Sequence, residues 1–169
     1  TSSQKAMRSG VSYLPGDRHA EGIFGDLTVR ENFSSRSPSD DIVAGFVRRS
    51  SEERRAKAAV DQFAVKTPSL ETPIRSLSGG NQQKLVLASV LAMKPRVLLV
   101  DEPTQGVDVG ARAEIYKVLR EVARSGVAII VVSSDANEVA GLSDRVAIFS
   151  RGRIVEVLEG DKVVEDNIT

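Results

Sequence analysis

The stretch Val97-Leu98-Leu99-Val100-Asp101-Glu102-Pro103 decides the fold of this chain of 169 residues. Its four leading apolar residues form a short, unbroken run that is typical of a strand buried on both faces of a parallel sheet. Two similar runs follow, at residues 127–132 and 146–149. Between the first two runs, residues 109–125 show helical spacing of apolar side chains, and Gly126 stands where a C-terminal cap is expected. Strand, helix and strand in this order predict a βαβ unit and an α/β fold.

The flanking segments predict a hairpin and a helical lobe. Residues 150–153 indicate a turn into an alternating strand at 154–158, which favours an antiparallel edge hairpin. Residues 50–63 predict an amphipathic helix, and residues 66–73 the loop that returns from it. We therefore divide the chain into three segments. They are residues 1–25, the start of the core; 26–76, a helical subdomain; and 77–169, the rest of the core.

The composition excludes several classes of protein. Lys and Arg number 23 and Asp and Glu number 23, so no overall field attracts nucleic acid or an anionic membrane. The basic residues at 48–57 alternate with Glu52 and Glu53, which favours a solvated helix face. Cysteine is absent, which excludes disulfides, and no apolar run reaches the roughly 20 residues of a membrane-spanning helix. The first residue is not Met, which fits a segment that begins inside a longer polypeptide.

Two clusters carry possible chemistry. Ser78-Gly79-Gly80 directly precedes a run of strong helix formers, where backbone amides, the helix dipole and the Ser78 hydroxyl can bind an anion such as phosphate. Taken alone, the same residues are more often an ordinary glycine-rich turn that caps a helix. Asp101 and Glu102 end the first apolar run. Asp101 can hold Mg²⁺ directly or through water, and Glu102 can orient or deprotonate a water that attacks a γ-phosphate. A solvated acidic strand end is the alternative for this pair.

Together these segments resemble the ATP-binding-cassette ATPase family. Leu77-Ser78-Gly79-Gly80-Asn81-Gln82-Gln83 is similar to its signature motif, and Leu98-Leu99-Val100-Asp101-Glu102-Pro103-Thr104 to its Walker B segment. Thr104-Gln105-Gly106-Val107-Asp108 resembles the family's D-loop. The resemblance implies a partial P-loop NTPase (RecA-like) parallel sheet with an inserted helical subdomain. Residues 13–18, 81–84, 106–111 and 132–135 further resemble the second cassette of duplicated ATPases that drive bacterial import of simple sugars or nucleosides.

The resemblance also implies roles for individual residues, with ATP and Mg²⁺ as cofactors. Cassettes of this family pair head to tail, so the signature residues would contact ATP held by a second cassette, and Asp108 would lie at the interface. The signature residues concerned are Ser78, Gly79, Gly80, Asn81 and Gln82. Glu102 would be catalytic and Asp101 would hold the metal in this cassette's own site.

The chain departs from the family pattern at three places. Ser134 stands where many cassettes carry a His that contacts the γ-phosphate, so Ser134 offers a hydrogen bond but no imidazolium charge. Gly16 replaces the expected Gln or Glu of the Q-loop, and Asp17 is the nearest polar substitute. No Gly-x-x-x-x-Gly-Lys-Ser/Thr loop occurs, so the chain lacks half of an ATP site. We expect the strand and helix of that loop upstream of Thr1, and the chain alone to be inactive.

The function that the resemblance implies is the ATP-binding part of a bacterial importer for simple sugars. Its partners would be a second nucleotide-binding cassette and membrane permease subunits, with no nucleic acid and no insertion into the membrane. The protein would then lie in the cytoplasm, at the inner face of the plasma membrane. One alternative is a non-hydrolysing regulatory cassette, which Gly16 and Ser134 favour and Glu102 opposes. A cassette protein of translation or chromosome maintenance is disfavoured because the chain has no long coiled coil or basic arm.

Overall fold

The computed structural model describes residues 2–43 and 45–168, so Thr1, Ala44 and Thr169 of the three predicted segments lie outside the described residues. Three parallel strands form the central sheet in the order β1-β4-β5. They are β1 (Val11–Leu14), β4 (Val97–Asp101) and β5 (Ala128–Val132). The strand predicted at 97–100 and the one predicted at 127–132 are therefore confirmed. Within the described part of the chain, no helix is long and apolar enough to cross a membrane.

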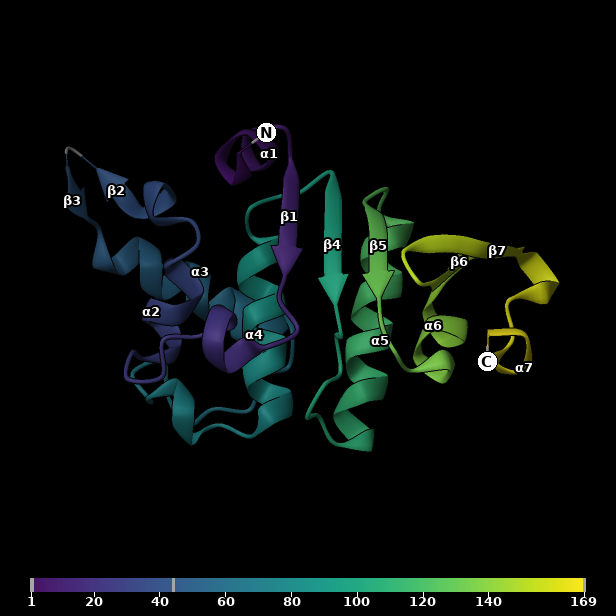
Figure 1. Ribbon diagram of the computed structural model, residues 1–169. Helices are drawn as coiled ribbons and strands as arrows, with labels where there is room; N and C mark the ends of the chain where they lie inside the picture. Colours follow the sequence, from purple (N-terminus) through teal and green to yellow (C-terminus); the bar gives the residue numbers. More distant parts are fainter. Residues whose placement is uncertain (1, 44, 169) are drawn as a thin grey trace.

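Two long helices cover one face of this sheet. Helix α4 (Gly79–Leu91) leads into β4, and α5 (Val109–Arg124) connects β4 to β5, which confirms the predicted βαβ unit. Leu87 of α4, Leu98 of β4 and Ile115 of α5 are each fully buried in one core cluster. The carboxyl ends of the three strands and the N-terminal ends of both helices lie along the lower side of Figure 1. This side is where ligands bind in open α/β sheets.

The predicted burial of the strands on both faces is wrong. Side chains of β4 alternate between buried and half-buried, and those of β5 between exposed and half-buried. Ile130 and Val132 are 54% and 61% exposed. The reason is that α4 and α5 cover one face of the sheet, so alternate side chains of the strands point away from these two helices.

The run at 146–149 forms a strand, but the prediction that it joins the parallel sheet is wrong. Strand β6 (Arg145–Ser150) pairs antiparallel with β7 (Arg153–Glu159) in a separate sheet of two strands. Arg151 and Gly152 form the turn with φ angles of 49° and 76°, and the predicted hairpin is confirmed. Helix α6 (Ala136–Leu142) precedes this hairpin. The short elements η4 (Gly160–Lys162) and α7 (Glu165–Ile168) follow it.

The segment between β1 and α4 forms mostly short helices. It contains η1 (Arg18–Gly22), α2 (Val29–Ser34), η2 (Pro38–Asp41), β2 (Ile42–Val43), β3 (Phe46–Val47), α3 (Arg49–Gln62) and η3 (Ile74–Ser76). A short helix α1 (Ser3–Arg8) precedes β1. The predicted amphipathic helix is confirmed as α3, although Arg48 occupies its N-cap and makes no side-chain capping bond.

A buried cation holds the parts of this helical segment together. Arg30 of α2 is 7% exposed, and its guanidinium donates to Glu52 of α3 and, from Nε at 2.8 Å, to Glu71. The hydrogen bond to Glu71 raises the pKa of Arg30 more than burial lowers it, and the same bond lowers the pKa of Glu71. Arg30 thus joins α2, α3 and the loop that leads to α4, as expected for a buried charge that needs partners.

Candidate functional site

The carboxyl end of β4 carries the acidic pair, and the two side chains diverge. The Tyr13 hydroxyl of β1 donates to Asp101 Oδ2 at 3.1 Å. Glu102 turns the other way, because its Oε1 accepts the Ser134 backbone N–H at 2.8 Å and its Oε2 the Ser133 hydroxyl at 3.3 Å. Tyr13, Asp101, Glu102 and Ser134 therefore meet where three neighbouring strands end, and we call these four residues the carboxylate group.

Glu102 occupies a strained backbone conformation. Its φ of 41° lies in the left-handed region, which costs a non-glycine residue on the order of 1 kcal/mol or more. Two backbone bonds hold it there, because the Glu102 N–H donates to Val132 O at 2.8 Å and the Glu102 carbonyl accepts the Gln105 N–H at 3.1 Å. Strain of this kind gathers at functional sites, where the surrounding structure maintains it.

The electrostatics of the carboxylate group suit a cation. Burial first, and the hydrogen bond to Asp101 second, raise the pKa of Tyr13, so its hydroxyl remains a donor at neutral pH. Among the described residues, Asp101 and Glu102 form no ion pair, and no cluster of three or more metal-ligating side chains exists. A single carboxylate fits Mg²⁺, which keeps several waters and takes its other ligands from substrate phosphates.

Gly16 lies directly against the acidic pair. A Cβ built on Gly16 would stand 3.2 Å from the Asp101 carbonyl oxygen and 3.3 Å from Glu102 Cβ. Gly16 therefore packs against the backbone of Asp101 and the base of the Glu102 side chain, and it has no side chain to extend toward a nucleotide. Asp17 is exposed at the next position, and its Oδ1 accepts the N–H groups of His19 and Ala20 at 3.0 Å each. The Asp17 carboxylate thus caps η1, and His19 is an exposed residue of that turn.

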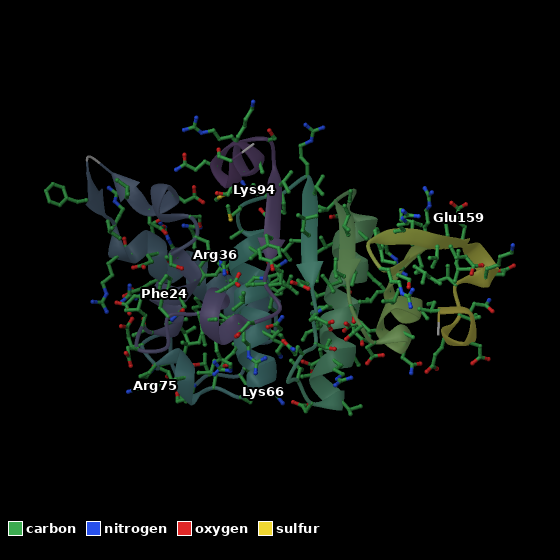
Figure 2. The ribbon with its side chains drawn as sticks, in the orientation of Figure 1. Phe24, Arg36, Lys66, Arg75, Lys94 and Glu159 are labelled. Atoms are coloured by element: carbon green, nitrogen blue, oxygen red, sulfur yellow. The ribbon has the colours of Figure 1, made fainter. Side chains whose placement is uncertain are left out.

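The second cluster lies at the N-terminus of α4. Ser78 is exposed at the N-cap but makes no capping bond, and its Oγ accepts from Asn81 Nδ2 at 2.8 Å. The hydroxyl proton of Ser78 is thereby left for a further acceptor. Asn81 is held in turn, because its Oδ1 accepts the Lys66 N–H at 2.7 Å. Figure 2 shows Lys66 at the lower end of α4. We call Ser78, Gly79, Gly80 and Asn81 the signature group.

Close packing explains both glycines of the signature group. A Cβ on Gly80 would stand 2.5 Å from Ala111 Cβ of α5, and Gly80 is buried. A Cβ on Gly79 would stand 2.8 Å from Arg18 Nη2 and 2.9 Å from the Gly106 carbonyl oxygen. The glycines therefore let α4 approach α5 and the loop after β4, a reason that the sequence pattern did not indicate. Their backbone N–H groups still begin the helix, and its dipole favours an anion there.

The assignment of Gln82 as a nucleotide contact needs correction. Gln82 is 4% exposed, and its Nε2 donates to the carbonyl oxygens of Ile74 at 3.2 Å and Leu77 at 3.1 Å. The motif places Gln82 close to Ser78 in sequence, but the helical turn directs its amide inward. Gln82 therefore joins α4 to η3 and has no free donor for a ligand.

Asp108 lies beside the signature group. It is the N-cap of α5, where its Oδ1 accepts the Ala111 N–H at 3.0 Å, and its Oδ2 would be 3.6 Å from a Cβ on Gly80. Among the described residues, no hydrogen bond or ion pair joins the signature group or Asp108 to the carboxylate group. The predicted site residues thus form two separate groups.

Tyr13, Ser133 and Arg18 contact the predicted site, but sequence analysis gave them no role. Tyr13 could have been found, since β1 and β4 are neighbours and Tyr13 precedes the end of β1 by one residue. Ser133 follows β5 as Glu102 follows β4, so strand order alone places the two together. The resemblance at residues 13–18 includes Arg18 but did not indicate its contacts, because its partners lie 64 to 88 positions further along the chain.

Comparisons with known proteins agree with this geometry. The model of the ABC transporter family matches residues 1–105. Ribose import ATP-binding protein RbsA 2 of Rhizobium etli is 42% identical over 164 residues, which cover 96% of this chain and 32% of that protein. RbsA of Hahella chejuensis is 42% identical, with 97% and 33% covered. The chain therefore spans about a third of the length of these curated relatives.

A solved structure shows the same fold. The ATP-binding cassette MJ0796, a dimer in a post-hydrolysis state bound to ADP and Pi, superposes with a TM-score of 0.75 and 20% identity. The superposition covers 94% of this chain and 68% of that one, and at this identity it shows the fold alone. It confirms the predicted partial P-loop NTPase fold. Since the family model covers well over half of the sequence, the chain belongs to the ABC transporter family.

Proposed function

We propose that this chain is part of the ATP-binding subunit of a bacterial importer for a simple sugar, where it couples ATP binding and hydrolysis to uptake. The names of the relatives, ribose import ATP-binding proteins, support the sugar class. The proposal that the chain hydrolyses ATP is supported by the Glu102 carboxylate next to Asp101, which the Ser134 N–H and the Ser133 hydroxyl hold in place. A carboxylate held in this way can bind a water molecule in one fixed position relative to the nucleotide.

Glu102 is the proposed base. The two donors of the segment after β5 fix its carboxylate, so that it can accept a proton from a water. The water oxygen bonds to the γ-phosphorus, the bond from that phosphorus to the bridging oxygen breaks, and the proton goes to Glu102. Asp101 would hold Mg²⁺, which supplies positive charge for the phosphate oxygens. Ser134 orients Glu102 through its backbone N–H.

The signature group is proposed to act on a different nucleotide, one held by a second cassette. Its separation from the carboxylate group supports this assignment, as does the exposed Ser78 hydroxyl. Preorganised amides and a helix dipole stabilise the developing charge of a γ-phosphate without having to reorganise. Asp108, exposed beside Gly80, is proposed to lie at the same interface.

A further strand is proposed to complete this cassette's own site. Strand β5 pairs only with β4, and β6 only with β7, within the described residues. A cavity of about 1360 Å³ separates β5 from β6 and is lined by apolar side chains that include Ile130, Val132 and Ile148. An exposed strand edge of this kind readily pairs with another strand. A strand that carries a glycine-rich phosphate loop with its Lys would cover the apolar side chains and place that loop beside Glu102.

The proposed function predicts that the chain alone binds Mg-ATP about 10²–10⁴-fold more weakly than the full-length protein. Two lost charge-assisted hydrogen bonds to phosphate, at about 1.5–3 kcal/mol each, account for a loss of this size. Isothermal titration of both proteins with Mg-ATP measures the difference. Equal affinities would show that the chain holds ATP without the proposed strand, and absence of binding and turnover in the full-length protein would contradict the function itself.

The regulatory cassette that does not hydrolyse ATP is the second candidate. It is supported by Ser134, which brings no imidazole to Glu102, and by Gly16, which brings no side chain to the acidic pair. In either case we propose attachment to a second cassette and to permease subunits at the cytoplasmic face of the membrane. The family and the import function in the names of the relatives support these partners.

A further inference from the structure

Arg18 binds the first turn of α4 and the loop after β4 with one guanidinium. Its Nη1 donates to the Gln105 carbonyl oxygen at 2.7 Å, and its Nη2 to the Gly106 carbonyl oxygen at 3.3 Å. Its Nε donates to Oε1 of the buried Gln82 in α4 at 3.3 Å. A guanidinium donates in a fixed planar fork, so these three acceptors are held in one relative arrangement.

The first turn of α4 lies against the same guanidinium. A Cβ on Gly79 would stand 2.8 Å from Arg18 Nη2, and a Cβ on Gly106 would stand 3.4 Å from both Nη atoms. Gly106 has a φ of 65°, so a side chain there would be strained even without Arg18. Residues with larger side chains at Gly79 would displace the guanidinium. The glycines therefore give Arg18 access to the carbonyl groups that it holds.

The backbone near Arg18 reaches the other group of site residues. The Arg18 N–H donates to the Gly16 carbonyl oxygen at 3.2 Å, and Gly16 packs against Asp101 and Glu102. Asp17 caps the turn that begins at Arg18, which fixes its direction. Residues 16–18 thus contact both the acidic pair and the signature group, although those two groups share no hydrogen bond or ion pair among the described residues.

We propose that Arg18 is a positioning residue that fixes the signature group relative to this cassette's own carboxylate group. The proposal rests on the proposed function for its catalytic consequence. Without the fork, the loop at 104–108 and the first turn of α4 lose their common anchor, so Ser78 and Gly79 no longer hold a defined place toward the nucleotide of a second cassette. Arg18 itself touches no reacting atom.

The test compares Arg18→Met, Arg18→Lys and the control Arg54→Met in the full-length protein. Arg54 is exposed on α3 and, among the described residues, forms no ion pair. Without nucleotide, we expect hydrogen exchange of the segments 78–84 and 103–110 to be faster in both Arg18 variants than in the wild type. In Arg54→Met we expect exchange of both segments to be unchanged. We also expect kcat for ATP to fall about tenfold or more and KM to change less than about threefold in both Arg18 variants.

Each outcome decides one of the two proposals. Arg18→Lys keeps the positive charge but not the fork, so wild-type exchange and kcat in that variant would overturn the positioning role. Unchanged exchange in either segment of Arg18→Met would overturn it as well. If exchange quickens as expected but the wild-type protein does not hydrolyse ATP, the proposed function fails while the structural anchor stands, and only the catalytic part of the inference is lost.

Discussion

Glu102→Gln in the full-length protein is expected to slow hydrolysis at its own site by about 10²–10⁴-fold and to leave ATP binding intact, because an amide cannot accept the proton of the attacking water. The amide oxygen can still accept from the Ser134 N–H, so the strained turn at Glu102 is preserved. The measurement is the fate of bound radiolabelled ATP. One nucleotide should persist as ATP for the period in which the wild type converts it to ADP.

Glu121→Gln is the matched control, because Glu121 is an exposed residue of α5 and the same atoms change. It should behave as the wild type. If Glu102→Gln also converts its bound ATP at the wild-type rate, then Glu102 is not the base. If the wild type itself leaves this ATP unconverted, the non-hydrolysing regulatory cassette is the better description. Loss of ATP binding in Glu102→Gln would mean that the carboxylate holds the nucleotide and not the water.

The second large effect is expected for Ser78→Arg, which should abolish hydrolysis of the nucleotide held by the second cassette. A long side chain would occupy the place of the γ-phosphate, and removing one preorganised donor alone costs about 10²–10³-fold in kcat. Ser78 is exposed and makes no capping bond, so the substitution should cost little stability. Nucleotide binding at this cassette's own site should be unaffected, since the signature group makes no bond to Asp101 or Glu102 among the described residues.

Ser125→Arg provides the control for added charge and size at an exposed position, the C-cap of α5. Steady-state turnover and the stoichiometry of bound ATP should be measured together for both variants. Ser78→Arg should retain binding at one site or more, whereas loss of all binding and all turnover would argue against action on a second cassette. Wild-type turnover in Ser78→Arg would exclude the signature group from catalysis.

Features with a local sequence signal could be predicted. The run at 97–100 and the helical spacing at 109–125 specified β4 and α5, because burial imposes a regular apolar pattern on each. The acidic pair could be placed at the carboxyl end of β4 for the same reason. The order of parallel strands then brings the residue after β5, Ser133, to Glu102.

Features that depend on distant partners could not be predicted. The strand at 146–149 has the apolar pattern of a sheet strand, but its pairing with β7 depends on which edges are free. The sequence predicts anion binding or a helix-capping turn at Gly80, and neither indicates that Ala111 packs against it. Gln82 has a polar side chain within the signature motif, which favours a ligand contact in the sequence. The helical turn instead directs its amide to the carbonyl groups of Ile74 and Leu77.

The central claim is that the signature group faces a nucleotide held outside this chain, and the reactivity of a single introduced thiol tests it most directly. The chain contains no cysteine, so Ser78→Cys adds the only thiol within these residues, and Ser125→Cys serves as the exposed control. The rate of modification by a thiol reagent is measured with and without Mg-ATP, in the chain alone and in the full-length protein. The account predicts that Mg-ATP protects the thiol of Ser78→Cys only in the full-length protein and protects the thiol of Ser125→Cys in neither. Equal reactivity of Ser78→Cys with and without Mg-ATP in the full-length protein, or its protection in the chain alone, would contradict the account.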